Sequence, residues 1–179
     1  FHAAPGVKVF DVKDSRPLSF EGKSYAALPP VEDDAKNHMT GLALLDGKLY
    51  VSYKARDVVA VFDAADAKQL ATIDVPSPTH LAAGPENTVY AVSGEKVVQI
   101  DTAGNRVRPF VSSHLDQPRG IAVHDDEVYV ANRGGLMNVS VFDTDGEYLK
   151  SIGREGGRNA IGAYQPDGMY MVGGIAFDT

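Results

Sequence analysis

Hydrophobic residues occur in this chain as short runs of about four to seven residues, each bounded by polar residues. One group of runs covers residues 120–123, 128–131, 139–143 and 148–152. These runs are rich in valine, isoleucine, tyrosine and phenylalanine, and none follows the period of about 3.6 residues that an amphipathic helix shows. The pattern therefore predicts four β-strands in this stretch.

This group of runs is the last of three copies of an internal repeat, which begin at Gly41, His80 and Gly120. A tyrosine in the second run recurs with spacings of 40 and 39 residues, and an aspartate that closes the third run recurs with spacings of 38 and 42. The tyrosines are Tyr50, Tyr90 and Tyr129, and the aspartates are Asp63, Asp101 and Asp143. Regular recurrence at this period is typical of propellers and solenoids.

Turn-forming residues join the runs within each copy. Examples are Asp46-Gly47 in the first copy, Thr102-Ala103-Gly104-Asn105 in the second and Asp145-Gly146 in the third. Aspartate, asparagine and glycine tolerate the backbone of tight hairpins. Four antiparallel strands in about 40 residues form the blade of a β-propeller. We therefore predict an all-β fold, a β-propeller of four-stranded antiparallel blades that is incomplete in this chain.

The third copy reads Pro118-Arg-Gly-Ile-Ala-Val123, then Val128-Tyr-Val-Ala-Asn132, then Val139-Ser-Val-Phe-Asp-Thr-Asp-Gly146. This pattern resembles the NHL repeat and its relatives among bacterial propellers. The resemblance extends over residues 7–179 and is weakest in the second copy, where His80 replaces the glycine. It implies a propeller fold and a periplasmic or secreted location, but it leaves the chemistry open, because propellers host unrelated functions.

We expect the chain to hold about three and a half blades. Residues 1–38 are predicted to supply the third and fourth strands of one blade (Val7–Asp11 and Leu18–Phe20) and a long connection. Blades follow at 39–78, 79–118 and 119–172, and 173–179 holds the first strand of another. We interpret this as a propeller segment; a four-bladed ring lacking one strand is the alternative. Open strand edges favour pairing with other blades of the same propeller or with a second chain, so we expect dimerisation or aggregation.

The composition argues against several classes of ligand and partner for this chain. The 179 residues are 44% hydrophobic, contain no cysteine and carry a net charge of -7. The absence of cysteine excludes disulfides, thiolate zinc sites and iron–sulfur clusters within these residues. The acidic balance is unfavourable for nucleic acid, and no run of about 20 apolar residues could span a membrane as a helix.

The loops after the second strands and the connections between blades are predicted to share one face. The long connections 21–39 and 153–172 also emerge there. Loops on a rigid scaffold are the usual place for ligands. Basic side chains that could gather on this face are Lys54, Arg56, Arg119, Arg133, Arg154 and Arg158. Such a rim suits a protein or an anionic small-molecule partner.

His38 and His80 are two further candidates for this binding face, because each precedes or opens an innermost strand. In the peptidyl-hydroxyglycine lyases, which this fold resembles, inner-face histidines hold zinc. Here only two histidines occupy such positions, so we predict no cofactor and keep a metal ion, zinc at His38 and His80 or calcium at Glu32–Asp34, as a hypothesis.

No catalytic residue is predicted. The aspartates and tyrosines that recur in every copy are interpreted as structural, the aspartates accepting hydrogen bonds from the turns that follow them. No nucleophile elbow and no phosphate-binding loop is present. We therefore expect a non-catalytic NHL-type propeller segment that binds a partner. The alternative is part of an extracytoplasmic propeller enzyme: a metal-dependent lyase, a lactonase-like hydrolase or a quinoprotein dehydrogenase.

Overall fold

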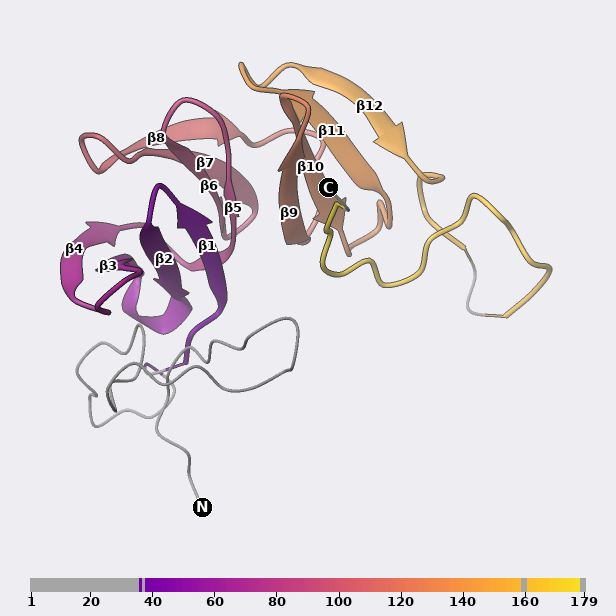
Figure 1. Ribbon diagram of the computed structural model, residues 1–179. Helices are drawn as coiled ribbons and strands as arrows, with labels where there is room; N and C mark the ends of the chain where they lie inside the picture. Colours follow the sequence, from indigo (N-terminus) through magenta and orange to yellow (C-terminus); the bar gives the residue numbers. More distant parts are fainter. Residues whose placement is uncertain (1–35, 37, 159–160, 178–179) are drawn as a thin grey trace, which may run out of the picture.

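The fold is all-β, and its strands form three separate four-stranded antiparallel sheets (Figure 1). The structure is a computed structural model and describes residues 36, 38–158 and 161–177. The first sheet contains β1 (Gly41–Leu45), β2 (Lys48–Tyr53), β3 (Val58–Asp63) and β4 (Gln69–Asp74). The second contains β5 (Pro78–Ala83), β6 (Thr88–Ser93), β7 (Lys96–Asp101) and β8 (Arg106–Val111). The third contains β9 (Pro118–His124), β10 (Glu127–Asn132), β11 (Val139–Asp143) and β12 (Tyr148–Ile152).

Each sheet is a meander in which every strand pairs with the next one along the chain. Tight hairpins make this possible, and the turn residues adopt the backbone that such hairpins need. In the turn from β1 to β2, Asp46 and Gly47 have φ of 48° and 70°; in the turn from β9 to β10, Asp125 and Asp126 have φ of 48° and 61°. Positive φ at both central residues matches the twist of the flanking strands. The predicted hairpins are thus confirmed at these positions.

The sheets are arranged as consecutive blades of a propeller. Strands β1, β5 and β9 lie next to one another on the inner side of the arc, and β4, β8 and β12 lie outside (Figure 1). The three described blades form an open arrangement, which confirms the predicted fold class.

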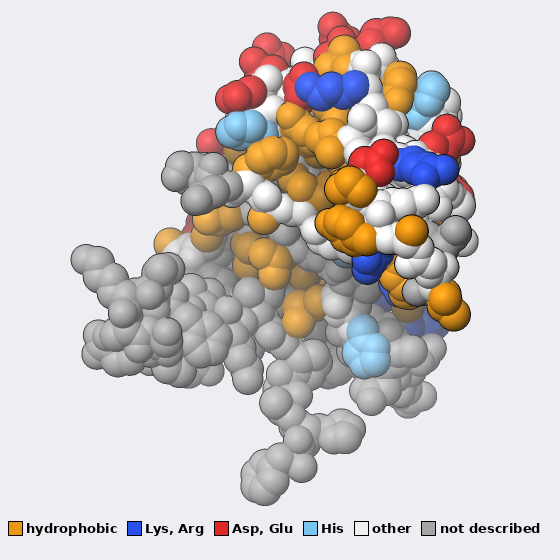
Figure 2. All heavy atoms as spheres, turned by 90° about the vertical axis from the view of Figure 1, so that its right-hand side faces the viewer, with side chains coloured by type: hydrophobic (Ala, Val, Ile, Leu, Met, Phe, Trp, Pro, Cys, Tyr) orange, Lys and Arg blue, Asp and Glu red, His pale blue; other side chains and the backbone are white. Residues whose placement is uncertain are grey.

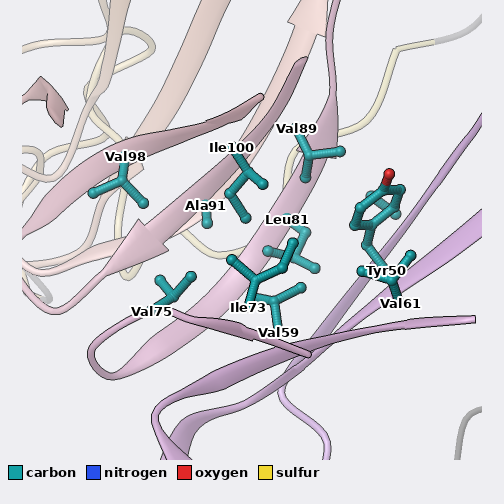
Figure 3. Close-up of a cluster of buried hydrophobic side chains, with 11 residues drawn as sticks. Tyr50, Val59, Val61, Ile73, Val75, Leu81, Val89, Ala91, Val98 and Ile100 are labelled. Atoms are coloured by element: carbon teal, nitrogen blue, oxygen red, sulfur yellow. The ribbon is translucent and has the colours of Figure 1, made fainter. Parts of the chain in front are cut away.

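Two hydrophobic cores hold the blades together, and each lies between neighbouring sheets. The first joins blades one and two; its members include Tyr50, Val59, Ile73, Leu81 and Ile100 (Figure 3). The second joins blades two and three through residues such as Tyr90, Val97, Ile121, Val128 and Phe142. A third cluster, which includes Val51, Tyr53 and Phe62, covers the other face of blade one. Alternation of side chains along each strand thus gives every blade two apolar faces.

The recurring aspartates have the structural role expected of them. The Oδ1 atoms of Asp63, Asp101 and Asp143 accept hydrogen bonds from the backbone N–H groups of Ala65, Ala103 and Asp145, at 2.7, 3.0 and 3.0 Å. Each bond closes the turn that leads to the fourth strand, as Asx residues commonly do. These carboxylates therefore stabilise the turns, as the sequence predicted.

The tyrosines differ from one blade to the next. Tyr50 and Tyr90 are buried in the two inter-blade cores, as expected for packing residues. Tyr129 is only partly buried, and its hydroxyl donates a hydrogen bond of 2.6 Å to Glu127 Oε2. This bond raises the pKa of Tyr129 to about 12, because it stabilises the neutral phenol. The difference arises because no described blade packs on the side of blade three where Tyr129 lies.

One strand prediction is wrong. Residues 174–177, predicted as the first strand of another blade, have no strand structure, because no described residue pairs with them in an antiparallel ladder. They nevertheless lie along β9, where Phe177 stacks on His124 and contacts Tyr129, with ring centroids 4.6 Å apart in both cases. The strands predicted at 7–11 and 18–20 lie outside the described residues.

Candidate functional site

A polar cavity of about 180 Å³ lies on the face that carries the loops between second and third strands. All three blades contribute to it. Lys54 begins the short 3-10 helix Lys54–Arg56 that follows β2, Thr79 belongs to β5, and Arg119 belongs to β9. Other residues that line the cavity are Ser77, Glu95 and Gln117. The propeller arrangement therefore brings two of the predicted basic residues to one site although they are far apart in the sequence.

The cavity has two cationic groups that are available to a ligand. Both Lys54 and Arg119 are exposed, and neither forms an ion pair or a side-chain hydrogen bond with any residue that the structure describes. Among the described residues, one carboxylate lines the cavity: Glu95, whose Oε2 accepts a hydrogen bond of 3.0 Å from the backbone N–H of Gln117. With two cations and one carboxylate, the lining has a net positive charge in a protein whose overall charge is -7.

His80 lies beside this cavity at the point where the other copies have glycine. It is half-buried in β5, and its Nδ1 atom is buried without a hydrogen-bond partner among the described residues. Burial lowers the pKa of the imidazole below its ordinary value of 6.5, and the positive charge of Arg119 lowers the pKa further. His80 is therefore a neutral side chain at neutral pH.

We expect His80 to titrate below pH 6.5, with a pH-dependent effect on folding. In the unfolded chain the imidazole gains its proton near 6.5, whereas in the folded protein it does so only at lower pH. The contribution of His80 to stability is therefore present above pH 6.5 and is lost as the pH falls from 6.5 through the folded-state pKa. NMR titration of the His80 ring measures this pKa, and Arg119→Gln should raise it. An unchanged pKa in that variant would contradict the assigned role of Arg119.

His38 is not brought together with His80 in a metal site. It is exposed ahead of β1, and across residues 36, 38–158 and 161–177 no group of three potential metal-ligating side chains is found. The predicted calcium candidate at Glu32–Asp34 lies outside the described residues. The metal hypothesis thus gains no support from this part of the chain.

The remaining arginines do not line the cavity. Arg56 braces the local structure: its Nε donates a hydrogen bond of 2.8 Å to the carbonyl of Lys36, and its guanidinium lies 5.4 Å from the centre of the Tyr53 ring. Arg133, Arg154 and Arg158 are exposed in the loops that follow β10 and β12. The predicted basic rim therefore reduces to one cluster, Lys54 and Arg119 with His80 beside it, and a set of separate surface charges.

The loop that carries Arg133 is held by a buried polar network. Asn132 Nδ2 donates hydrogen bonds of 3.0 and 2.9 Å to Asn138 Oδ1 and Ser140 Oγ, and Asn132 Oδ1 accepts one of 3.0 Å from the backbone N–H of Asp116. Asn132, Asn138 and Ser140 are all buried. These hydrogen bonds pair polar groups that are buried and hold the loop in place, so we assign them a structural role.

The structure also shows a larger cavity, about 670 Å³, that the sequence analysis missed. It lies on the opposite face between blades two and three, where four carboxylates, one arginine and the Tyr90 hydroxyl surround it. The carboxylates are Glu86, Asp101, Asp126 and Asp145. The sequence did contain a sign of this cavity: Gln99 is polar, whereas the equivalent residues of the other blades, Val61 and Val141, are apolar and buried. In the structure, Gln99 donates hydrogen bonds to Tyr90 Oη and to the carbonyl of Thr144.

The sequence matches no protein-family model and no curated protein. Solved structures match by fold. In the crystal structure of the nidogen/laminin complex, the match has 16% identity and a TM-score of 0.65, and it covers 84% of this chain and 59% of that chain. Virginiamycin B lyase from Staphylococcus aureus gives 17% identity and a TM-score of 0.61 over 82% of this chain and 48% of that chain. The computationally designed Ika8 protein gives 18% identity and a TM-score of 0.58 over 98% of this chain and 48% of that chain. These neighbours show the β-propeller fold. The chain spans about half to three fifths of their length.

No helix long and apolar enough to cross a membrane occurs in the part of the chain that the structure describes.

Proposed function

We propose that this chain is a non-catalytic, NHL-type propeller segment that binds an acidic partner at the Lys54–Arg119 cavity. The observation that carries the proposal is the convergence on one polar cavity of two cations, from blades one and three, that have no ion-pair partner among the described residues. A guanidinium and an ammonium are the groups that bind carboxylates most strongly in proteins. The blades supply a rigid support, and the loops supply the charged groups.

The size of the cavity limits what it accepts. Sites for small molecules and cofactors usually measure about 300–1,000 Å³. A volume of about 180 Å³ accommodates one side-chain-sized group. We therefore propose that the occupant is the carboxylate of an aspartate, a glutamate or a chain terminus of a protein partner. The nidogen/laminin complex supports this choice, because there a propeller of similar fold occurs in a protein–protein complex.

Binding of an acidic peptide tests the proposal. With a fluorescently labelled peptide rich in glutamate, we expect fluorescence anisotropy to show saturable binding that weakens as the salt concentration rises. Arg119→Gln and Lys54→Gln should each raise Kd about tenfold or more, because each removes a charge-assisted hydrogen bond worth about 1.5–3 kcal/mol.

A matched control is Arg106→Gln. Arg106 is an exposed cation at the start of β8, away from the cavity, and its replacement changes the net charge equally. It should leave Kd within about twofold, a change of about 0.4 kcal/mol. Equal weakening by all three variants would mean that the peptide responds to overall charge only, and the proposed site would then be rejected.

A second candidate, a propeller enzyme of the lyase type, is supported by one observation. His80 lies on an innermost strand as a neutral imidazole, and its Nδ1 has no partner among the described residues. Such a group could act as a general base. One structural neighbour is a catalytically inactive histidine-to-alanine variant of virginiamycin B lyase with quinupristin. Turnover of quinupristin by this chain, absent in His80→Asn, would replace the binding proposal with this one.

A further inference from the structure

The innermost strands share an alternation of one bulky residue and one alanine. The pairs are Leu42-Ala43 in β1, Leu81-Ala82 in β5 and Ile121-Ala122 in β9. Ala43 lies in the same buried cluster as Leu81, and Ala82 lies in the same buried cluster as Ile121. The alanine of each blade thus leaves room for the bulky side chain of the next blade.

Glycines at the start of these strands allow the backbones to approach closely. A Cβ atom added to Gly41 would collide with the carbonyl oxygen of Thr79 in the next blade. A Cβ atom added to Gly120 would collide in the same way with the carbonyl oxygen of Gly173. The segment 173–177 therefore lies where the next innermost strand belongs, and it carries the same motif as Gly174-Ile175-Ala176.

The two ends of this series are complementary, and no other described blade packs on either of them. On the side of blade one, Leu42 is 55% exposed, whereas its counterparts Leu81 and Ile121 are only 8% and 6% exposed; Leu44, two residues further along β1, is 60% exposed. On the opposite side, Ala176 is exposed and nothing lies within 4 Å of a Cβ atom added to Gly174. Among residues 36, 38–158 and 161–177, no alanine packs against the bulky side chains of the first end, and no neighbouring strand packs against the alanine and glycine of the second.

The side that carries segment 173–177 is also rich in exposed hydrophobic side chains (Figure 2). Ile152, Tyr170, Met171 and Phe177 are between 36% and 49% exposed, and Ile161 is 92% exposed. Polar and charged side chains lie between the hydrophobic ones in this view. Exposed hydrophobic side chains that gather on one face are typical of interaction sites.

We propose that two copies of this chain associate head to tail through these ends, with Leu42 of one copy packed on Ala176 of the other. The backbone before Leu42 then approaches Gly174 as Thr79 approaches Gly41 within the chain. The occupant is a second copy, because both halves of the contact repeat an interface that the chain already forms twice. This inference does not depend on the proposed ligand site.

Light scattering after size-exclusion chromatography, over a hundredfold range of protein concentration, tests the proposal. We expect the wild-type mass to rise to at least twice that of one chain. Gly174→Ala should raise the dissociation constant tenfold or more, because the added methyl group blocks the close approach. The same methyl group meets no described atom within 4 Å in one copy, and φ of Gly174 is not in the left-handed region, so we expect the fold to be unaffected.

Gly173→Ala is the matched control. Its added Cβ also meets nothing within 4 Å, and its counterparts at this position, Thr79 and Arg119, carry side chains. This variant should associate like the wild type. A monomeric wild type at every concentration, or equal association by the wild type and Gly174→Ala, would overturn the proposal.

Cross-linking gives a second, independent measurement. The chain has no cysteine, so introduced thiols have no competitor. A mixture of Leu42→Cys and Ala176→Cys proteins should form a disulfide-linked dimer under oxidising conditions. A mixture of Ala176→Cys with Leu70→Cys, which is also exposed but lies on β4, should not. Equal cross-linking in both mixtures would contradict the proposed contact.

Discussion

Replacing Phe142 by alanine is expected to lower the free energy of unfolding by about 3–5 kcal/mol, the usual cost of removing a buried aromatic side chain. Phe142 is 0% exposed and belongs to the core between blades two and three. Its ring makes edge contacts with Phe110 and Tyr148, at centroid distances of 6.3 and 5.9 Å. The substitution therefore leaves a cavity in the core that joins these two blades, and urea denaturation followed by circular dichroism measures the loss.

Leu149→Ala is the control for this prediction. Leu149 lies on β12, the outer strand of the same blade, and is 46% exposed. Its removal should change stability by less than about 1 kcal/mol, because the side chain already contacts solvent. If both variants lost the same stability, the core between blades two and three would not be the main support of blade three.

The second large effect is expected from Gly41→Ala, which should destabilise the protein by about 1–3 kcal/mol. The added methyl group would collide with the carbonyl oxygen of Thr79 and approach the Cα atom of His80. Both contacts are with backbone, which cannot move aside as a flexible side chain can. Strands β1 and β5 must separate, and the packing between blades one and two is then disturbed. Thermal unfolding or urea denaturation measures the effect.

Gly173→Ala serves as the control here too. It makes the same chemical change in a glycine whose added Cβ meets no atom within 4 Å. We expect a stability change within about 0.5 kcal/mol. A wild-type stability for Gly41→Ala would show that the innermost strands lie farther apart than the structure places them.

The strands were predictable because their signal is local. Tight turns such as Asp46-Gly47 and Asp125-Asp126 fix which strands pair, and alternation along each strand fixes which side chains face a neighbouring blade. Recurrence added further information: a residue present in every copy, such as Asp63 or Asp101, serves the blade itself. The hydrogen bonds from these aspartates to the turns that follow confirm that interpretation.

The candidate site was predictable only in part. Lys54 and Arg119 were both predicted as members of a basic rim, but so were Arg56 and Arg133. The sequence did not show which of these residues line a cavity and which do not. That distinction depends on contacts between residues that are far apart in the sequence. Arg56 is held by the carbonyl of Lys36 and lies against Tyr53, whereas Lys54 and Arg119 meet at a cavity between blades. The cavity beside Gln99 was missed because it arises from two blades together.

Segment 173–177 is a second example of a feature that the local sequence pattern does not fully specify. Its sequence resembles an innermost strand, and it lies on β9 where such a strand belongs. It is not a strand, because strand structure requires hydrogen bonds to a neighbouring strand, and no described residue provides them. Local pattern specified the position of this segment but not its pairing.

The sequence by itself determined the repeat, the strands, the turns and the propeller fold, since all of these follow from side-chain alternation and turn chemistry within about 40 consecutive residues. Tertiary structure decided which charged groups converge, which tyrosines are buried and which apolar residues remain uncovered. Those properties depend on how one blade packs against another. The innermost strands of neighbouring blades lie close together although about 40 residues separate them in the sequence. A pattern within one repeat therefore does not specify which side chains of two blades meet.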